Sequence, residues 1–138
     1  MSNLRNEDSD LLYSNNTGNT IASLVESKLG CPYEWGAAGP NSFDCSGLAY
    51  WAHQQVGISI PRMSSDQGAS GTPISVGDLQ PGDLMFYDTK GSGSITHTTI
   101  YVAGTSMIHA PKAGDVVKYT DMNYDYWTTK FKGARRYW

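Results

Sequence analysis

Apolar positions in the first half of the chain recur at helical spacing in two segments. The first follows Thr20, a candidate N-cap, and stops at Gly30, a candidate C-terminal stop; its apolar positions are Ile21, Leu24, Val25 and Leu29. The second follows Cys45 and stops near Gly57; its apolar positions are Leu48, Ala49, Trp51, Ala52 and Val56. The spacing therefore predicts two helices, the second beginning at or next to Cys45.

After residue 57 the pattern changes to short β-type runs separated by turns. The strongest turn signal is Gln80-Pro81-Gly82-Asp83, and a single helical turn is expected at 64–67. Two runs, 97–102 and 106–110, flank Ala103-Gly104-Thr105 and predict a hairpin. The other predicted extended segments are 58–62, 84–87, 116–119 and 131–138. Helices followed by strands predict an α+β fold, with N-terminal helices packed on an antiparallel sheet.

The register of the hairpin decides whether its two histidines lie on the same face of the sheet. Strand alternation puts His97, Thr99 and Tyr101 on one face. If Thr99 lies opposite His109, both histidines share that face as diagonal neighbours, whereas a slip of one residue separates them. We therefore predict that paired residue numbers sum to 208, with an odd-numbered loop of three or five residues around Gly104.

Composition describes one globular domain behind a polar start. Residues 1–18 are rich in Asn, Ser and Asp without an apolar period, which predicts a linker or disordered terminus before a domain at 19–138. Hydrophobic residues at 39% and charged residues at 17% are ordinary for a single domain. The net charge of −3 gives no reason to expect a nucleic-acid partner, and no apolar run is long enough for membrane insertion. No basic and then apolar leader opens the sequence.

Cys45 is the candidate nucleophile. At a helix start, the backbone N–H groups and the helix dipole stabilise a thiolate, and Asp44 can cap the helix. Small Ser46 and Gly47 leave the sulfur accessible. The alternatives are a buried structural cysteine and a disulfide with Cys31, which would consume the nucleophile; we expect two free thiols.

The hairpin histidines are the candidate base and orienting residue. His97 can take the Cys45 proton, and His109 can fix the ring of His97, which is the general logic of a catalytic triad. The alternatives are two histidines on a half-exposed sheet face, or a zinc site with Cys45 that lacks the usual paired spacing and a fourth ligand. We therefore expect no metal and no cofactor. His53 is expected to be a surface or satisfied histidine.

The loop before Cys45 carries two large aromatic residues, Tyr33 and Trp35, among glycines and prolines. The Tyr33 hydroxyl could reach a reacting carbonyl, although packing is the commoner role of such a residue.

Several runs in this order resemble the NlpC/P60 family of papain-like cysteine peptidases, from about Thr20 to the C-terminus. They are Pro32-Tyr33-Glu34-Trp35-Gly36, Phe43-Asp44-Cys45-Ser46-Gly47-Leu48, Ile60-Pro61-Arg62-Met63-Ser64, Leu79-Gln80-Pro81-Gly82-Asp83-Leu84, His97-Thr98-Thr99-Ile100-Tyr101-Val102 and Met107-Ile108-His109-Ala110-Pro111. The resemblance implies the papain-like fold and a peptidoglycan hydrolase that cleaves stem peptides between D-γ-glutamate and the diamino acid at the third position.

The resemblance also implies roles for single residues. Cys45 is then the nucleophile, His97 the base, His109 the orienting residue, and the Tyr33 hydroxyl part of the oxyanion hole. The implied substrate-binding residues are Asp44 and Ser46, which hold the amine of the stem peptide, together with Trp35. Arg62 and Asp83 match positions expected to be structural. The chain departs from the family at Thr98-Thr99, where Val-Gly is common, and loss of that glycine is expected to narrow the groove beside the base.

These features lead to one expected function and two alternatives. We expect a secreted, wall-associated or phage-borne cysteine endopeptidase that acts on peptidoglycan stem peptides as a monomeric domain of a longer protein. An N-acetylmuramoyl-L-alanine amidase or another acyl transfer on the same scaffold would need the same residues. A non-catalytic wall-binding domain would not need Cys45, His97 and His109 together.

Overall fold

The computed structural model describes residues 17–138, so the first 16 residues of the predicted linker lie outside the described part. Residues 17–26 are helical, and Thr20 is an exposed residue within this helix. The predicted N-cap at Thr20 is therefore wrong, because the helix continues back through polar residues that carry no apolar signal. Gly18, which the sequence placed in the linker, is buried in the same helix.

Three further helical segments and one 3-10 turn are spread along the chain. Helix α2 (Cys45–Gln55) begins where the sequence predicted it, and α3 (Ser64–Gln67) is the predicted single turn. The 3-10 turn Val76–Asp78 and helix α4 (Asp125–Thr128) had no clear apolar period and were not predicted. The predicted extended segment 58–62 is a connector without strand pairing, because its Ile60 is buried alone against the helices and Pro61 has no N–H to donate.

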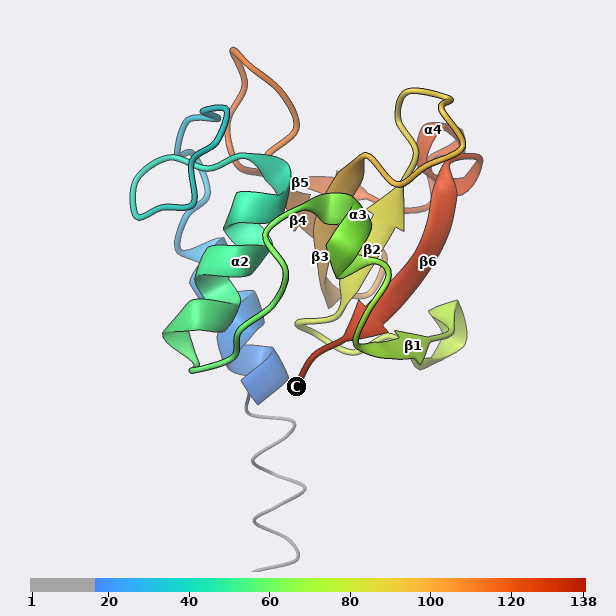
Figure 1. Ribbon diagram of the computed structural model, residues 1–138, viewed down its shortest axis with the longest axis horizontal. Coiled ribbons are helices and arrows are strands. Elements are labelled where there is room, and N and C mark those ends of the chain that lie inside the picture. The colour runs from blue at the N-terminus through green and yellow to red at the C-terminus, as the bar shows by residue number, and fades with distance from the viewer. Residues whose placement is uncertain (1–16) are drawn as a thin grey trace, which may run out of the picture.

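Six antiparallel strands form one sheet in the order β1-β6-β2-β3-β4-β5. Their bounds are β1 Thr72–Ile74, β2 Leu84–Tyr87, β3 His97–Ala103, β4 Ser106–His109, β5 Lys118–Asp121 and β6 Phe131–Arg136. Strand β1 was not predicted, and β5 lies two residues later than expected. Figure 1 shows α2 and the helix of residues 17–26 on one side of this sheet, which is the predicted α+β arrangement.

The hairpin of β3 and β4 has the predicted register. Ile100 pairs with Ile108 and Tyr101 with Met107, so both pairs sum to 208. The register then shifts, and Ala103 pairs with Ser106. The predicted odd-numbered loop is therefore wrong: an extra residue in β3, Val102, forms a bulge and leaves a two-residue turn, Gly104-Thr105.

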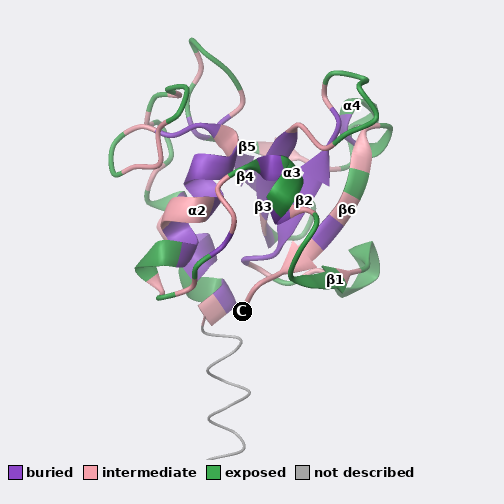
Figure 2. Cartoon of the chain, in the orientation of Figure 1, coloured by how far each residue is buried: buried purple, intermediate pink, exposed green. Residues whose placement is uncertain are grey.

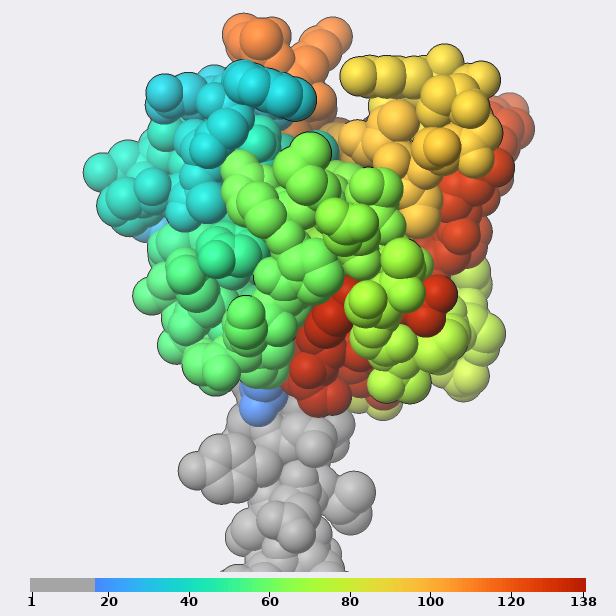
Figure 3. Space-filling model, viewed as in Figure 1, coloured from blue at the N-terminus to red at the C-terminus, as the bar shows by residue number. Residues whose placement is uncertain are grey.

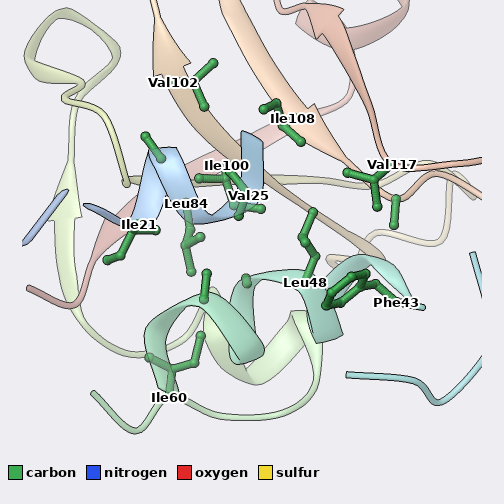
Figure 4. Close-up of a cluster of buried hydrophobic side chains, with 14 of the residues drawn as sticks. Ile21, Val25, Phe43, Leu48, Ile60, Leu84, Ile100, Val102, Ile108 and Val117 are labelled. Atoms are coloured by element: carbon green, nitrogen blue, oxygen red, sulfur yellow. The ribbon is translucent and has the colours of Figure 1, made fainter. Parts of the chain in front are cut away.

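The sheet buries apolar side chains on both faces. The larger cluster lies between the sheet and the helices, where the labelled side chains of Figure 4 point toward one another, among them Ile21, Leu48 and Ile100. A smaller cluster on the opposite face holds Met85, Tyr87, Met107, Trp127 and Ala134. Figure 2 shows the buried strands at the centre and the exposed loops around one end of the sheet. Thr98 and Thr99, on alternate sides of β3, are both fully buried.

The turn before β2 joins the first helix to the last strand. Gly82 has φ 92°, and a Cβ there would lie 2.6 Å from the Gly18 carbonyl oxygen, so the turn packs directly on the helix backbone. The buried Asp83 carboxylate accepts hydrogen bonds from Arg136 at 2.7 and 2.8 Å and from the Gln80 N–H at 2.8 Å. Because both oxygens are engaged within the fold, Asp83 has the structural role expected from the sequence.

Among residues 17–138, no helix is long and apolar enough to cross a membrane.

Candidate active site

Asp44 organises the start of α2. Its Oδ1 accepts the Gly47 N–H at 2.7 Å as an N-cap, and its Oδ2 accepts the Gly36 N–H at 3.0 Å from the preceding loop. Arg62 donates to both oxygens, at 3.1 and 2.8 Å, and also to Ser46 Oγ at 2.8 Å. A single carboxylate thus fixes the helix start, the 36–44 loop and Arg62 in one arrangement.

Gly47 is required at this helix start by close packing. A Cβ at this position would collide with the Ala37 carbonyl group and lie 2.7 Å from Asp44 Oδ1. The absence of a side chain therefore lets the 36–39 loop cover the first turn of α2. Cys45, two residues before Gly47, remains partly exposed at this helix start.

Cys45 and Cys31 are both free thiols, so the disulfide alternative is wrong. The sulfur of Cys45 lies 3.5 Å from Ser64 Oγ, and this is its hydrogen-bond contact among the described residues. Cys31 packs against the main core cluster as a half-buried thiol. The cysteine at the helix start is thus the one that lines a groove.

His97 and His109 form the predicted pair at the end of the sheet. His97 Nε2 lies 2.8 Å from His109 Nδ1, and both side chains are buried. Burial, reinforced by the neighbouring His109, lowers the pKa of His97 to about 3. Burial and the charge of Lys118 lower the pKa of His109 to about 4, against a smaller opposing effect of Asp115. Both imidazoles are therefore neutral at neutral pH, and His97 is able to accept a proton.

Trp127 holds the histidine pair from the second core cluster. Its ring lies 5.7 Å from that of His97 in a stacked arrangement and 5.3 Å from that of His109 edge-on. Its Nε1–H donates to Thr120 Oγ1 at 3.1 Å, which fixes the indole in turn. No sequence pattern pointed to Trp127, because a four-residue helix gives no periodic signal.

His53 is not a surface residue, contrary to one of the two expectations. It is fully buried in α2, where Nδ1–H donates to the Ala49 carbonyl at 2.8 Å and Nε2 has no hydrogen-bond partner among residues 17–138. Burial lowers the pKa of His53 to about 4. It takes no part in the arrangement around Cys45.

A groove of about 450 Å³ lies beside Cys45. The predicted site residues Tyr33, Trp35, Asp44 and Ser46 all line it, as do Arg62 and Ser64. Burial raises the pKa of Tyr33, with further contributions from Cys45 and Asp44, so its hydroxyl remains a hydrogen-bond donor. Trp35 is 80% exposed and presents an open aromatic face to anything that enters the groove.

A second groove of about 540 Å³ lies beside the histidines. It is lined by His97 and His109 and by a charged set in which Lys118 pairs with Asp115 at 2.8 Å. Lys90 lines both grooves, so the two meet at its loop. In Figure 3 a notch at the top of the molecule separates the cyan loop before Cys45 from the yellow loop that carries Lys90, with the orange loop behind.

Asp88 orders the loop that carries Lys90. The Asp88 carboxylate accepts backbone N–H groups from Lys90 and Ser92 at 3.1 Å and from Gly93 at 2.7 Å. The segment 91–94 consists of glycine and serine alone, a composition that favours flexibility. The hydrogen bonds of Asp88 give this segment a defined conformation between the two grooves.

The departure at Thr98-Thr99 does not narrow the groove as expected. Thr99 is fully buried, and its hydroxyl lies 3.0 Å from Met107 Sδ on the side of the second core cluster. Thr98 faces the helices and lies 2.8 Å from Ser64 Oγ. The extra methyl and hydroxyl groups are thus absorbed by the protein interior.

The zinc alternative receives no support from the geometry. Among the described residues, no three His, Cys, Asp or Glu side chains are grouped so that they could hold a metal ion. Instead, the histidine nitrogens are directed at each other, at the 2.8 Å separation of a hydrogen bond.

Comparison with known proteins identifies the fold and the family. Residues 30–136 match the NlpC/P60 family. The chain belongs to the NlpC/P60 family. Its papain-like structure is also seen in an NlpC/P60 family protein from Bacillus cereus, with a TM-score of 0.82 and 34% sequence identity over 87% of this chain and 40% of the other. The family membership inferred from the Asp44-Cys45-Ser46-Gly47 step and the later runs is therefore confirmed.

Three curated relatives in this NlpC/P60 family carry endopeptidase or peptidase names. A probable endopeptidase of Corynebacterium glutamicum is 47% identical over 78% of this chain and 50% of the relative. The murein DD-endopeptidase MepH of Escherichia coli is 38% identical over 79% of this chain and 42% of the relative. A gamma-D-glutamyl-L-lysine dipeptidyl-peptidase of Bacillus cereus is 37% identical over 79% of this chain and 33% of the relative. The chain spans half or less of the length of these relatives.

Proposed function

We propose that this domain is a cysteine endopeptidase of peptidoglycan that cleaves the bond between D-γ-glutamate and the diamino acid of a stem peptide. The observation that carries the proposal is the arrangement at the joined grooves: a free thiol at a capped helix start and a buried, neutral histidine pair 2.8 Å apart. The names of the family relatives support this class of reaction, while they differ in the bond that they specify.

The proposed reaction uses residues that line the two grooves. The Cys45 sulfur attacks the γ-glutamyl carbonyl after His97 takes its proton, and the Tyr33 hydroxyl with N–H groups at the start of α2 stabilises the oxyanion. His97 then gives the proton to the leaving amine, and water hydrolyses the thioester. His97 Nε2 and His109 Nδ1 lie 2.8 Å apart. We assign the hydrogen to His97 Nε2, because this tautomer leaves the His97 Nδ1 free to accept a proton and makes His109 the orienting residue.

The first groove is the proposed binding site for the acyl part, L-alanyl-γ-D-glutamate. Trp35 offers an aromatic face, and Ser46 and Asp44 offer polar groups near the sulfur. Asp44 already accepts hydrogen bonds from two backbone N–H groups and from Arg62. A substrate amine would therefore share the negative charge of the Asp44 carboxylate with these donors. Arg62 and Ser64, which line the same groove, are added to the proposed binding residues.

The second groove is the proposed binding site for the leaving residue, because His97 must reach the leaving amine and lines this groove. Lys90, Lys112 and Lys118 line it against one carboxylate, Asp115, which is paired with Lys118. This surplus of positive charge favours a leaving residue that carries a carboxylate on its side chain and disfavours one that ends in an ammonium group alone.

The experiment that tests the proposal is digestion of purified peptidoglycan, followed by mass spectrometry of the new termini. A new α-amine on the third-position diamino acid, together with a new carboxyl end on D-glutamate, supports the proposal. A free L-alanine amine would show an amidase, a cut after D-alanine would show a DD-endopeptidase, and no new terminus would show a wall-binding domain. Cys45→Ala is the matched inactive protein, and Cys31→Ala should retain turnover. By its proposed substrate the domain acts in a secreted, wall-associated or phage-borne protein.

A further inference from the structure

Four side chains form a continuous hydrogen-bonded series from the protein interior to the nucleophile. Gln67 Oε1 lies 2.9 Å from Thr98 Oγ1, Thr98 Oγ1 lies 2.8 Å from Ser64 Oγ, and Ser64 Oγ lies 3.5 Å from the Cys45 sulfur. Gln67 and Thr98 are fully buried, so no solvent exchanges with their polar groups.

The direction of this series is fixed at its buried end. The Gln67 amide donates to the Ser46 carbonyl at 3.1 Å and to the Pro61 carbonyl at 2.9 Å. Both amide hydrogens are therefore used, and the carbonyl oxygen of Gln67 faces Thr98 as an acceptor. Exchanging the amide oxygen and nitrogen would set the oxygen against two carbonyls, which excludes the other orientation.

Thr98 has a single hydroxyl hydrogen for two neighbours. When it donates to Gln67, Ser64 donates to Thr98, and the Cys45 thiol donates to Ser64, so that every group has a partner. For the Ser64 hydroxyl to donate to a Cys45 thiolate, it must turn away from Thr98. Thr98 then either keeps Gln67 and faces the Ser64 oxygen with no hydrogen between the two oxygens, or turns to Ser64 and leaves the buried Gln67 oxygen without a donor. An unsatisfied buried carbonyl is costly, so the first arrangement is preferred in the resting protein.

We propose that Thr98 is a positioning residue that directs the Ser64 hydroxyl away from Cys45 and thereby keeps the resting nucleophile in its thiol form. The His97 imidazole, whose pKa is lowered by burial, is neutral in the resting protein. Other titratable groups around the sulfur are Tyr33, Asp44, Arg62 and Lys90, which line the same groove. They are unchanged in the variants below, so the comparison isolates the hydroxyl series.

Thr98→Val tests the proposal, because it keeps the shape of the side chain and removes only the hydroxyl. The rate of Cys45 alkylation by iodoacetamide is measured against pH in a Cys31→Ala background, with mass spectrometry of the labelled peptide. The pH midpoint of the rate should fall by about 1 unit in Thr98→Val, since Ser64 is then free to donate to the thiolate. Thr98→Ser, which retains the hydroxyl, should keep the parent midpoint.

A double-mutant cycle separates this effect from a structural one. With Ser64→Ala in place, Thr98→Val should no longer move the midpoint, because no hydroxyl remains to be redirected. Gln67→Met provides an independent variant, which frees the Thr98 hydrogen for Ser64 and should also lower the midpoint. An unchanged midpoint in Thr98→Val, or an equal shift with and without Ser64, would overturn the proposal. Alkylation needs no peptide substrate, so the result stands apart from the proposed endopeptidase activity.

Discussion

His97 and His109 meet through unlike ring nitrogens, Nε2 of the first and Nδ1 of the second, at 2.8 Å and with their ring planes 79° apart. The two residues lie on neighbouring strands whose register puts both rings on one face, where Trp127 packs against them. This hydrogen bond couples the two tautomers, because only one of the two facing nitrogens carries the hydrogen. When His97 donates from Nε2, its Nδ1 is the nitrogen available to take a proton.

The first prediction concerns this hydrogen bond. His109→Ala should lower kcat on a stem peptide by about 10²-fold, because His97 loses the acceptor that fixes its tautomer, whereas His97→Ala should lower it by about 10²–10⁴-fold. His109→Asn should recover most of the loss, since its Oδ1 can occupy the place of Nδ1. Equal kcat values for the Ala and Asn variants would contradict an orienting role.

The second prediction concerns the oxyanion. Tyr33→Phe should lower kcat by about 10–100-fold with little change in KM, because the hydroxyl acts on charge that develops in the transition state. The pKa of Tyr33 is raised by burial, so the hydroxyl of the parent protein should support turnover up to at least pH 9. Steady-state kinetics of the two proteins provide the test, and a raised KM at constant kcat would assign Tyr33 to ground-state binding instead.

The third prediction is a loss of stability in acid. His53, His97 and His109 have folded-state pKa values of about 4, 3 and 4, below the ordinary value of 6.5. The unfolded chain therefore binds more protons between pH 6.5 and about 4, and the free energy of unfolding falls as the pH falls through this window. Each histidine contributes on the order of 1 kcal/mol per pH unit.

Urea unfolding at pH 7, 6, 5 and 4.5 measures this slope. His53→Phe is the informative variant, because it removes one of the three buried histidines and is the one that takes no part in the proposed site. Its slope should be about one third smaller, and a slope equal to that of the parent protein would show that His53 does not titrate in this window.

The fourth prediction concerns Gly47. Gly47→Ala should destabilise the fold by about 2–4 kcal/mol and reduce turnover, because a Cβ would push the 36–39 loop off the start of α2. Gly77→Ala is the matched control, since a Cβ there meets nothing within 4 Å and the backbone φ is unstrained. Thermal unfolding of both variants decides the point; similar melting temperatures would mean that the loop adapts.

The fifth prediction concerns the leaving residue. Two stem peptides that differ only in a free or an amidated side-chain carboxylate at the third position differ by one charge. The peptide with the free carboxylate should have a roughly 3–10-fold higher kcat/KM, because exposed lysines line the second groove. This ratio should be smaller at high salt, which screens the charges. Lys112→Met should reduce the ratio toward 1, while Lys132→Met, an exposed lysine of β6, should not. A ratio of 1 in the parent protein, with cleavage of both peptides, rejects only the charge preference.

The sequence carried much of the fold and of the site because two kinds of signal were local. Helical spacing after Cys45 and strand alternation around His97 and His109 were sufficient to predict where the candidate nucleophile and the histidine pair lie. The wrong N-cap at Thr20 and the missed strand β1 had no local signal. Residues 17–20 of the first helix are polar, and β1 pairs with a strand some 60 residues away. Trp127 and Ser64 acquire their roles only through neighbours that the fold brings to them.

The bulge at Val102 has a consequence for how the hairpin tolerates change. The register that sets His97 and His109 on one face is already fixed at Ile100 and Ile108, before the chain reaches its turn. Residues 103–105 are exposed, and the shift beyond Tyr101 takes up the extra residue. The length of the turn is thus separated from the geometry of the histidines, which makes the Gly104-Thr105 tip a place where a peptide could be grafted without disturbing the pair.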